Sequence, residues 1–366
     1  MGRVDAILGQ PHAIELLQSA LQTDRLHHAL IFHGPKGVGK FTTARALAAI
    51  LLCHEVAKKA ASSFLPPVRA CGTCRSCAAL RAGSHPDDHV ITKELARFSS
   101  DAAVRDRKLM TIPTAVLREN LIEPVNLAPR LGSHKVFVVD EAELLDSVSQ
   151  NILLKTLEEP PAGTYVILVT DAEDRLLPTI RSRCMRVPFR PLPQAVVADW
   201  LDGRRAGLDE PKRRWLIDFS DGSIGWAGLA LEYDLYQWAA DILLALDGMA
   251  DRRYPAELGR CMSDGVDRFA RRWVDEHEGA SKDAANRQAA TLMWSMIAHH
   301  ARGKLAGAVP AARGGDPAAT EAVLEPWLDL IDAVGRAEYE TRCHVNLGIV
   351  MDHFASMAYR AVSPTS

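Results

Sequence analysis

The stretch that decides the fold is glycine-rich and reads Gly34-Pro35-Lys36-Gly37-Val38-Gly39-Lys40-Phe41-Thr42-Thr43. It follows the apolar run Ala29-Leu30-Ile31-Phe32 and precedes a helix-forming segment that begins at Ala44. A strand, a glycine-rich turn and a helix in this order are typical of a phosphate-binding loop, whose backbone N–H groups and helix N-terminus surround phosphate oxygens. Lys40 would then reach the β and γ phosphates. The alternative is a plain glycine-rich turn between a strand and a helix.

One position departs from the phosphate-loop pattern. The residue after the lysine is normally Ser or Thr and holds magnesium, but this chain has Phe41 there. Thr42 lies one position further on, rotated by about 100° around a helix, so we do not expect it to replace that ligand directly.

The wider pattern predicts an α/β fold followed by an all-α part. Apolar, β-branched runs alternate with helical patterns at residues 29–32, 89–92, 135–139, 165–169 and 185–188, which indicates a parallel sheet covered on both faces. No comparable run follows Pro191. We therefore predict a phosphate-loop domain at 1–190, a small helical module at 191–233 and a helical domain at 234–366, interrupted by the breaker Gly314-Gly315-Asp316-Pro317.

Two acidic residues follow the predicted strand at 135–139. Asp140 could hold magnesium, and Glu141 could polarise an attacking water. The alternative is a helix N-cap with acidic residues in the first turn. The phosphate loop earlier in the chain favours the catalytic ancestry.

Four of the seven cysteines lie between Cys53 and Cys77. Cys71, Cys74 and Cys77 are spaced by two residues, and Cys53 can complete a tetrahedral set. We predict a structural zinc module at about 53–81, with His54 as a competing ligand. A redox-active Cys-x-x-Cys pair is the alternative.

Composition sets the remaining limits. The chain has 366 residues, 48% hydrophobic and 24% charged, with a net charge of −3, so nothing indicates a globally basic nucleic-acid-binding protein. No stretch is long and apolar enough to span a membrane, and no signal-peptide core is present, so we expect a cytoplasmic protein without a membrane partner.

With these segments the chain resembles the delta-prime subunits of the bacterial DNA polymerase III clamp loader, members of the AAA+ family. The resemblance covers roughly the first 230 residues. It rests on the phosphate loop, the cysteine insertion, Ile7-Leu8-Gly9-Gln10, Gly83-Ser84-His85-Pro86-Asp87, the run Leu153-Leu154-Lys155-Thr156-Leu157-Glu158-Glu159-Pro160-Pro161, and Ser182-Arg183-Cys184. It implies an AAA+ domain with an inserted zinc module, a helical lid and a C-terminal oligomerisation collar.

The resemblance also implies a role. The expected function is that of a stator-like, non-motor subunit of an ATP-dependent loader that opens the sliding clamp and loads it on primed DNA during replication. At the positions equivalent to Phe41 and Gly225, motor relatives have a Thr and a phosphate-sensing Arg. We therefore expect weak or absent ATPase activity and no polymerase chemistry from this chain. The expected partners are the gamma/tau motor subunits and the delta subunit, with the clamp and primer-template DNA reached through the hetero-oligomer.

The expected site residues follow from both lines of reasoning. Arg183 should act as an arginine finger toward nucleotide on a neighbouring subunit, and its alternative is a surface arginine paired with a carboxylate. ATP or ADP binding by this chain is possible, with candidate contacts at Gly34, Pro35, Gly37, Val38, Gly39, Lys40, Thr42, Asp140, Glu141 and Thr170. The alternative functions are an active motor subunit of the same loader, like gamma/tau, and a zinc-dependent DNA-binding module.

Overall fold

The computed structural model describes residues 7–59, 68–105, 111–249, 257–277, 281–312, 317–343 and 345–362. The chain divides into two compact units. The first comprises Met1–Leu208 and Ser220–Trp226, and the second comprises Asp209–Phe219 and Ala227–Ser366. Among the described residues, no helix has the length and apolar character that crossing a membrane requires.

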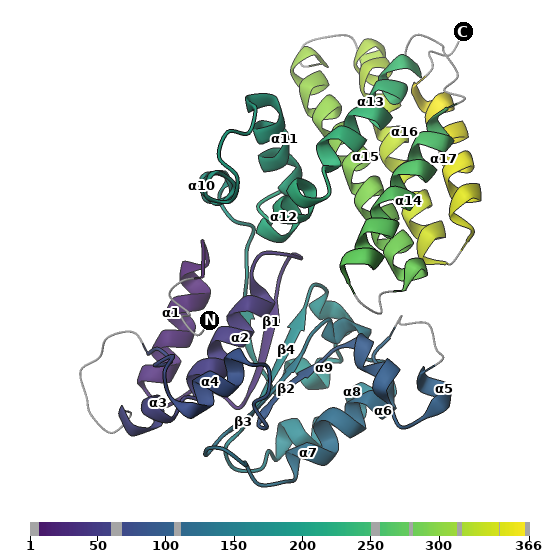
Figure 1. Ribbon diagram of the computed structural model, residues 1–366. Coiled ribbons are helices and arrows are strands. Elements are labelled where there is room, and N and C mark those ends of the chain that lie inside the picture. The colour runs from purple at the N-terminus through teal and green to yellow at the C-terminus, as the bar shows by residue number, and fades with distance from the viewer. Residues whose placement is uncertain are drawn as a thin grey trace. The chain divides into compact units, whose positions relative to one another are not determined.

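A parallel five-stranded sheet organises the first unit, as the sequence predicts (Figure 1). The strand order is β2-β3-β4-β1-β5. The strands are β1 (Ala29–His33), β2 (Asp88–Ile91), β3 (Lys135–Val139), β4 (Thr164–Thr170) and β5 (Met185–Pro188). All five lie where the apolar runs place them.

Helices cover both faces of this sheet (Figure 1). Alternate residues of each strand point to opposite faces: Leu30 and Phe32 pack with α1 and α2, whereas Ala29 and Ile31 pack with α6, α8 and α9. The α-helices of this part are α1 (Pro11–Gln22), α2 (Lys40–Leu51), α3 (His54–Lys59), α4 (Arg75–Arg81), α5 (Ala102–Arg105), α6 (Thr114–Leu117), α7 (Glu123–Val125), α8 (Ser147–Glu158), α9 (Pro178–Arg181) and α10 (Gln194–Arg204). Shorter helical turns are η2 (Lys93–Phe98), η3 (Arg118–Ile122), η4 (Ala142–Leu144) and η5 (Glu173–Arg175).

The described part of the second unit is helical, which confirms the predicted change of fold class. Trp294 is fully buried at its centre, packs on Phe354 and donates a hydrogen bond from Nε1 to Thr341 Oγ1 at 3.1 Å. The later helices of the chain are α11 (Glu210–Ser220), α12 (Ile224–Glu232), α13 (Leu235–Met249), α14 (Leu258–Glu276), α15 (Lys282–Ala312), α16 (Pro317–Arg342) and α17 (Leu347–Val362). The predicted breaker lies between α15 and α16, and its residues 314–316 are outside the described residues.

Candidate functional site

The phosphate loop connects β1 to α2, and its backbone needs glycine. Gly34, Gly37 and Gly39 have φ values of 136°, 75° and 102°, which side-chain-bearing residues rarely adopt. A Cβ atom on Gly34 would lie 2.2 Å from the carbonyl oxygen of Phe189, just after β5. The loop is therefore closely enclosed by neighbouring backbone as well as conformationally restricted.

Lys40 is the first residue of α2 and is almost fully buried. Its Nζ donates to the carbonyl oxygens of Gly34 at 2.7 Å and Pro35 at 2.6 Å, and to Asp171 Oδ1 at 2.6 Å. All three ammonium hydrogens thus have acceptors from this chain. Asp171 follows β4 directly and was not among the predicted site residues, because its place beside the loop depends on the pairing of β1 with β4.

The backbone of Gly225 packs against the backbone of the phosphate loop at Gly37. Its N–H donates to the carbonyl oxygen of Gly37 at 2.9 Å, and a Cβ atom on Gly225 would lie 2.8 Å from the Gly37 Cα. The N-terminal turn of α12 therefore contacts the phosphate loop in a way that only glycine allows. From the sequence, we expected Gly225 only to lack a sensor charge.

Gln10 is a second residue whose role the sequence did not reveal. Its buried amide donates from Nε2 to the carbonyl oxygens of Val38 at 3.2 Å and Arg190 at 2.7 Å, and its Oε1 accepts from Arg190 N–H at 3.2 Å. Gln10 thus joins the phosphate loop to the segment after β5. The motif Ile7-Leu8-Gly9-Gln10 marked Gln10 in the sequence but did not predict its hydrogen-bond partners.

The side chains just after Lys40 face different surroundings. Phe41 is 37% exposed and occupies the position where the pattern requires a magnesium ligand. Thr42 is exposed, and Thr43 is buried, with its hydroxyl donating to the carbonyl oxygen of Gly39 at 2.8 Å. In the described structure, neither Thr42 nor Thr43 therefore replaces the hydroxyl that is missing at Phe41.

The two predicted acids lie at the end of β3. Burial raises the pKa of Asp140 to about 6, and the neighbouring Glu141 carboxylate adds to that shift. Glu141 has a left-handed backbone with φ 51° and pairs through Oε2 with Lys93 Nζ at 2.6 Å. Glu141 occupies the N-cap position of η4, as the alternative supposed, but its side chain makes no capping hydrogen bond.

Thr170 ends β4 and pairs in register with His33, the last residue before the phosphate loop. The side chain is buried, and its Oγ1 accepts from the N–H of Ala172 at 3.1 Å. Thr170 thus lies in the strand next to the loop, with its hydroxyl fixing the turn that carries Asp171.

Arg183 follows α9 and is partly exposed. Its Nε lies 2.6 Å from Glu158 Oε1, and Nη1 donates to the carbonyl oxygen of Thr179 at 3.0 Å. Within one chain, the side chain thus makes the carboxylate pair that we set out as the alternative. Its role toward a neighbouring subunit stays a prediction.

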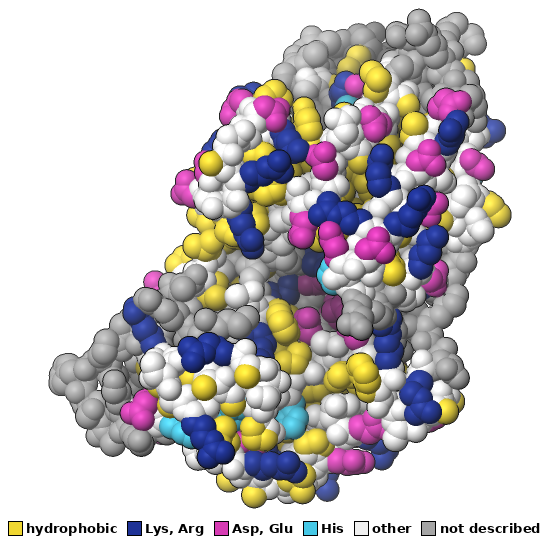
Figure 2. Space-filling model, in the orientation of Figure 1, with side chains coloured by type: hydrophobic (Ala, Val, Ile, Leu, Met, Phe, Trp, Pro, Cys, Tyr) yellow, Lys and Arg dark blue, Asp and Glu magenta, His cyan; other side chains and the backbone are white. Residues whose placement is uncertain are grey.

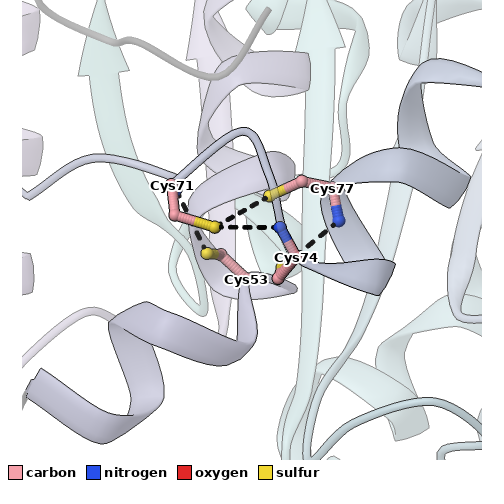
Figure 3. Close-up of side chains that lie close together, drawn as sticks. All are labelled: Cys53, Cys71, Cys74 and Cys77. Atoms are coloured by element: carbon pink, nitrogen blue, oxygen red, sulfur yellow. Dashed lines mark hydrogen bonds between the residues drawn. The ribbon is translucent and has the colours of Figure 1, made fainter.

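The four clustered cysteines converge at the other end of α2 (Figure 3). Their Sγ atoms all lie within 4.8 Å of one another, and Cys71 Sγ is 3.9 Å from Cys77 Sγ. Tetrahedral zinc with Zn–S bonds of about 2.3 Å requires sulfur separations of about 3.8 Å. The donor set therefore fits a closed, structural zinc site. His54 donates from Nε2 to the carbonyl oxygen of Leu131 at 2.8 Å and lies outside this set.

The protonation of these thiols depends strongly on their neighbours. Hydrogen bonds from the backbone N–H groups of Thr73 and Cys74 lower the pKa of Cys71 to about 6. Burial raises the pKa of Cys77, and the nearby Cys74 and Cys53 add to the shift. A bound cation would favour the thiolate form of all four, because metal ligation requires deprotonated sulfur.

Comparisons with known proteins show the family of this chain. Residues 9–193 match the family described as DNA polymerase III, delta subunit. DNA polymerase III subunit delta' of Escherichia coli is 33% identical over 63% of this chain and 63% of its own length, and that of Pseudomonas aeruginosa is 37% identical over 54% and 53%. DNA polymerase III subunit gamma/tau of Mycobacterium tuberculosis is 35% identical over 51% of this chain and 28% of its own.

The chain thus spans less than two thirds of the length of these relatives. Among solved structures, a gamma-subunit-related protein of Thermotoga maritima covers 95% of this chain and 99% of its own, at 16% identity and a TM-score of 0.44. The family match spans about half of the sequence, including the phosphate loop and the four cysteines. The chain therefore belongs to the DNA polymerase III delta subunit family, and it is delta-prime-like.

Proposed function

We propose that this protein is a non-motor, stator-like subunit of the DNA polymerase III clamp loader. In that complex, ATP hydrolysis by neighbouring motor subunits would drive the opening of the sliding clamp and its loading on primed DNA. The observation that carries the proposal is the set of contacts and substitutions in the phosphate loop. Lys40 is bound by two loop carbonyls and Asp171, Gly225 packs on Gly37, and Phe41 replaces the magnesium ligand. Phosphoryl transfer depends on positioned cations, so this arrangement supports negligible ATP hydrolysis by the chain itself.

The same proposal assigns Arg183 to the active site of a neighbouring motor subunit. The guanidinium is partly exposed, and its Nε partner is a carboxylate on the surface of α8. A phosphate group can replace a carboxylate as the acceptor of a forked pair of N–H donors. Arg183 could therefore exchange Glu158 for the γ-phosphate of nucleotide held by the adjacent subunit.

Structural zinc is the cofactor that we propose, held by Cys53, Cys71, Cys74 and Cys77. When bound, zinc would supply a fixed crosslink between the end of α2 and the turn before α4. ATP or ADP remains a second candidate ligand, since Lys40, Asp140 and Glu141 are present.

An active motor subunit is the second candidate function. It is favoured by the match to gamma/tau subunits and by the complete lysine and acidic motifs. The third candidate, a zinc-dependent DNA-binding module, has less support. On the face that Figure 2 shows, the basic side chains of the C-terminal helices are interspersed with acidic ones and form no single-sign patch.

ATP hydrolysis separates these functions. The chain alone should show negligible turnover, whereas a motor subunit would turn over ATP by itself. In a loader reconstituted with motor subunits, clamp and primed DNA, Arg183→Ala should lower the DNA-stimulated ATPase rate by up to about 10³–10⁵-fold where the finger is the main stabiliser. Arg186→Ala is the matched control, because Arg186 also pairs with a carboxylate of its own chain, Glu173. A normal rate with Arg183→Ala would leave this subunit an architectural role only.

A further inference from the structure

A buried hydroxyl lies between two of the zinc ligands. Ser76 is fully buried in the first turn of α4, between Cys74 and Cys77. Its Oγ is 2.5 Å from the carbonyl oxygen of Leu52 and 2.9 Å from His85 Nε2. Leu52 directly precedes Cys53, the ligand that comes from the end of α2. Ser76 therefore connects both ligand-bearing segments to His85.

The direction of these hydrogen bonds is determined by His85. The N–H of Asp87 donates to His85 Nδ1 at 3.1 Å, so Nδ1 is an acceptor and carries no proton. In a neutral imidazole the proton is then on Nε2, which donates to Ser76 Oγ. The Ser76 hydroxyl is left to donate to Leu52 O. Each donor and acceptor in this buried chain is used once.

A second set of hydrogen bonds reaches the other neighbour of Cys53. The Asp87 carboxylate accepts from the N–H groups of Arg130 and Leu131, each at 2.7 Å. Leu131 O lies 2.8 Å from His54 Nε2, and His54 directly follows Cys53. Both chain neighbours of Cys53 are thus linked to this segment through one intermediate residue, Leu52 to His85 through Ser76 and His54 to Asp87 through Leu131.

We infer that His85 is a positioning residue of the zinc site, acting through Ser76 and Leu52 to fix Cys53 relative to Cys74 and Cys77. The inference rests on the proposed zinc site. Ligands that are already held in place lose less conformational freedom when the ion binds. Hydrogen-bonded groups outside the ligand set commonly change metal affinity by about 10–100-fold. The motif Gly83-Ser84-His85-Pro86-Asp87, which identified the family without a known role here, thereby gains one.

The test is zinc affinity, measured on the full chain by competition with a chromophoric chelator. Ser76→Ala and His85→Ala should each weaken zinc binding by about 10–100-fold. Because both belong to one hydrogen-bond chain, the double variant should weaken binding little further than either single one. His85→Gln keeps a donor near the Nε2 position and should restore part of the affinity. Ser84→Ala is the matched control, since Ser84 is exposed and lies next to His85 in sequence.

Each outcome distinguishes the positioning role from the zinc site itself. Cobalt substitution supplies a second readout, because the thiolate-to-cobalt absorption reports whether all four sulfurs still bind. Wild-type affinity in Ser76→Ala and His85→Ala, together with loss of zinc in Cys74→Ser, would overturn the positioning role and leave the zinc site standing. If the wild-type chain binds no zinc, both the positioning role of His85 and the zinc site itself are refuted. If His85→Ala does not fold, Ser76→Ala carries the test, because it removes a single oxygen atom.

Discussion

Two motifs with ligand-binding chemistry, the phosphate loop and the cysteine cluster, lie at the two ends of helix α2, and they differ in what their groups are bonded to. At the N-terminus, Lys40 has three acceptors from its own chain, and the loop carbonyl of Gly37 is already bonded to Gly225. Beyond the C-terminus, four sulfur atoms converge within 4.8 Å of one another. The first motif has its cation satisfied internally, whereas the second brings together ligands that favour a cation from outside.

This difference shows that a motif specifies where groups lie more reliably than what they bind. The phosphate loop has the correct strand, glycines and lysine, yet Lys40 is already bonded to Asp171, and Gly225 packs on Gly37. Among the residues that the structure describes, the main internal contacts of the cysteine cluster are N–H···S hydrogen bonds, which are weaker than the ion pair and carbonyl contacts of Lys40. Substitutions at the two ends should therefore have opposite consequences for ligand binding.

The largest expected effect is at the cysteine end. Cys74→Ser should reduce bound zinc from about one equivalent per chain to almost none, because structural sites depend on a complete tetrahedral set. The loss should remove several of the roughly 10–16 kcal/mol that such zinc sites provide. Metal analysis of protein purified without added zinc measures the change, and hydrogen exchange locates it. Exchange at residues 40–44 should stay as in the parent chain. Full folding and unchanged exchange in the metal-free parent would refute the zinc assignment.

The next effect is at the phosphate-loop end and depends on pH. Burial and Glu141 raise the pKa of Asp140 from 3.8 to about 6, so the folded state binds the proton more tightly than the unfolded state. This stabilisation is fully present below about pH 4 and is lost as the pH rises through about 6. The loss amounts to about 3 kcal/mol, at about 1.4 kcal/mol per pKa unit.

Asp140→Asn should remove this dependence. Urea unfolding at pH 4, 5, 6 and 8 should show the stability of the variant gaining on that of the parent as the pH rises. Glu141→Gln serves as a partial control, because it removes only the second cause of the shift and should reduce the slope without abolishing it. Parallel pH profiles for the parent and Asp140→Asn would contradict the raised pKa.

Much of the fold was predictable from the sequence, because it depends on local patterns. The five apolar runs gave the five strands, since continuous β-branched segments have few alternatives to buried parallel strands. The cysteine spacing likewise predicted the cluster, because two-residue gaps and a nearby helix end leave little freedom. The contacts of Asp171, Gly225 and Gln10 were not predictable. They join segments up to 188 residues apart, from Gly37 to Gly225, and only the three-dimensional pairing brings these together.

Gly37→Ala tests how tightly the phosphate loop is enclosed. Gly37 has φ 75°, and a Cβ atom would lie 2.2 Å from Ser223 Oγ. The substitution should destabilise the first unit by about 2 kcal/mol through backbone strain and displacement of Ser223. The matched control is Gly203→Ala in α10, where no atom lies within 4 Å of the new methyl group and a small stabilisation is expected. Equal stabilities of the two variants in urea would show that the loop can open at no cost.

The smallest effect concerns the ion pair at Lys40 and bears most directly on the comparison. Asp171 is one-third exposed, so its pair with the buried Lys40 should contribute about 1.4 kcal/mol or less. Asp171→Asn should therefore raise the affinity for ATP by up to about tenfold, measured by titration with a fluorescent nucleotide, while ATP turnover stays negligible because Phe41 is unchanged. Asp234→Asn is the control, since Asp234 forms a Lys–Asp pair of the same 2.6 Å length with Lys212 in the second unit. An unchanged affinity in Asp171→Asn would mean that Lys40 is not what limits binding. The contact between Gly225 and Gly37 would then be what limits nucleotide binding at the phosphate loop. The two ends of α2 would in that case differ in ligand binding because of backbone packing, not because of charge.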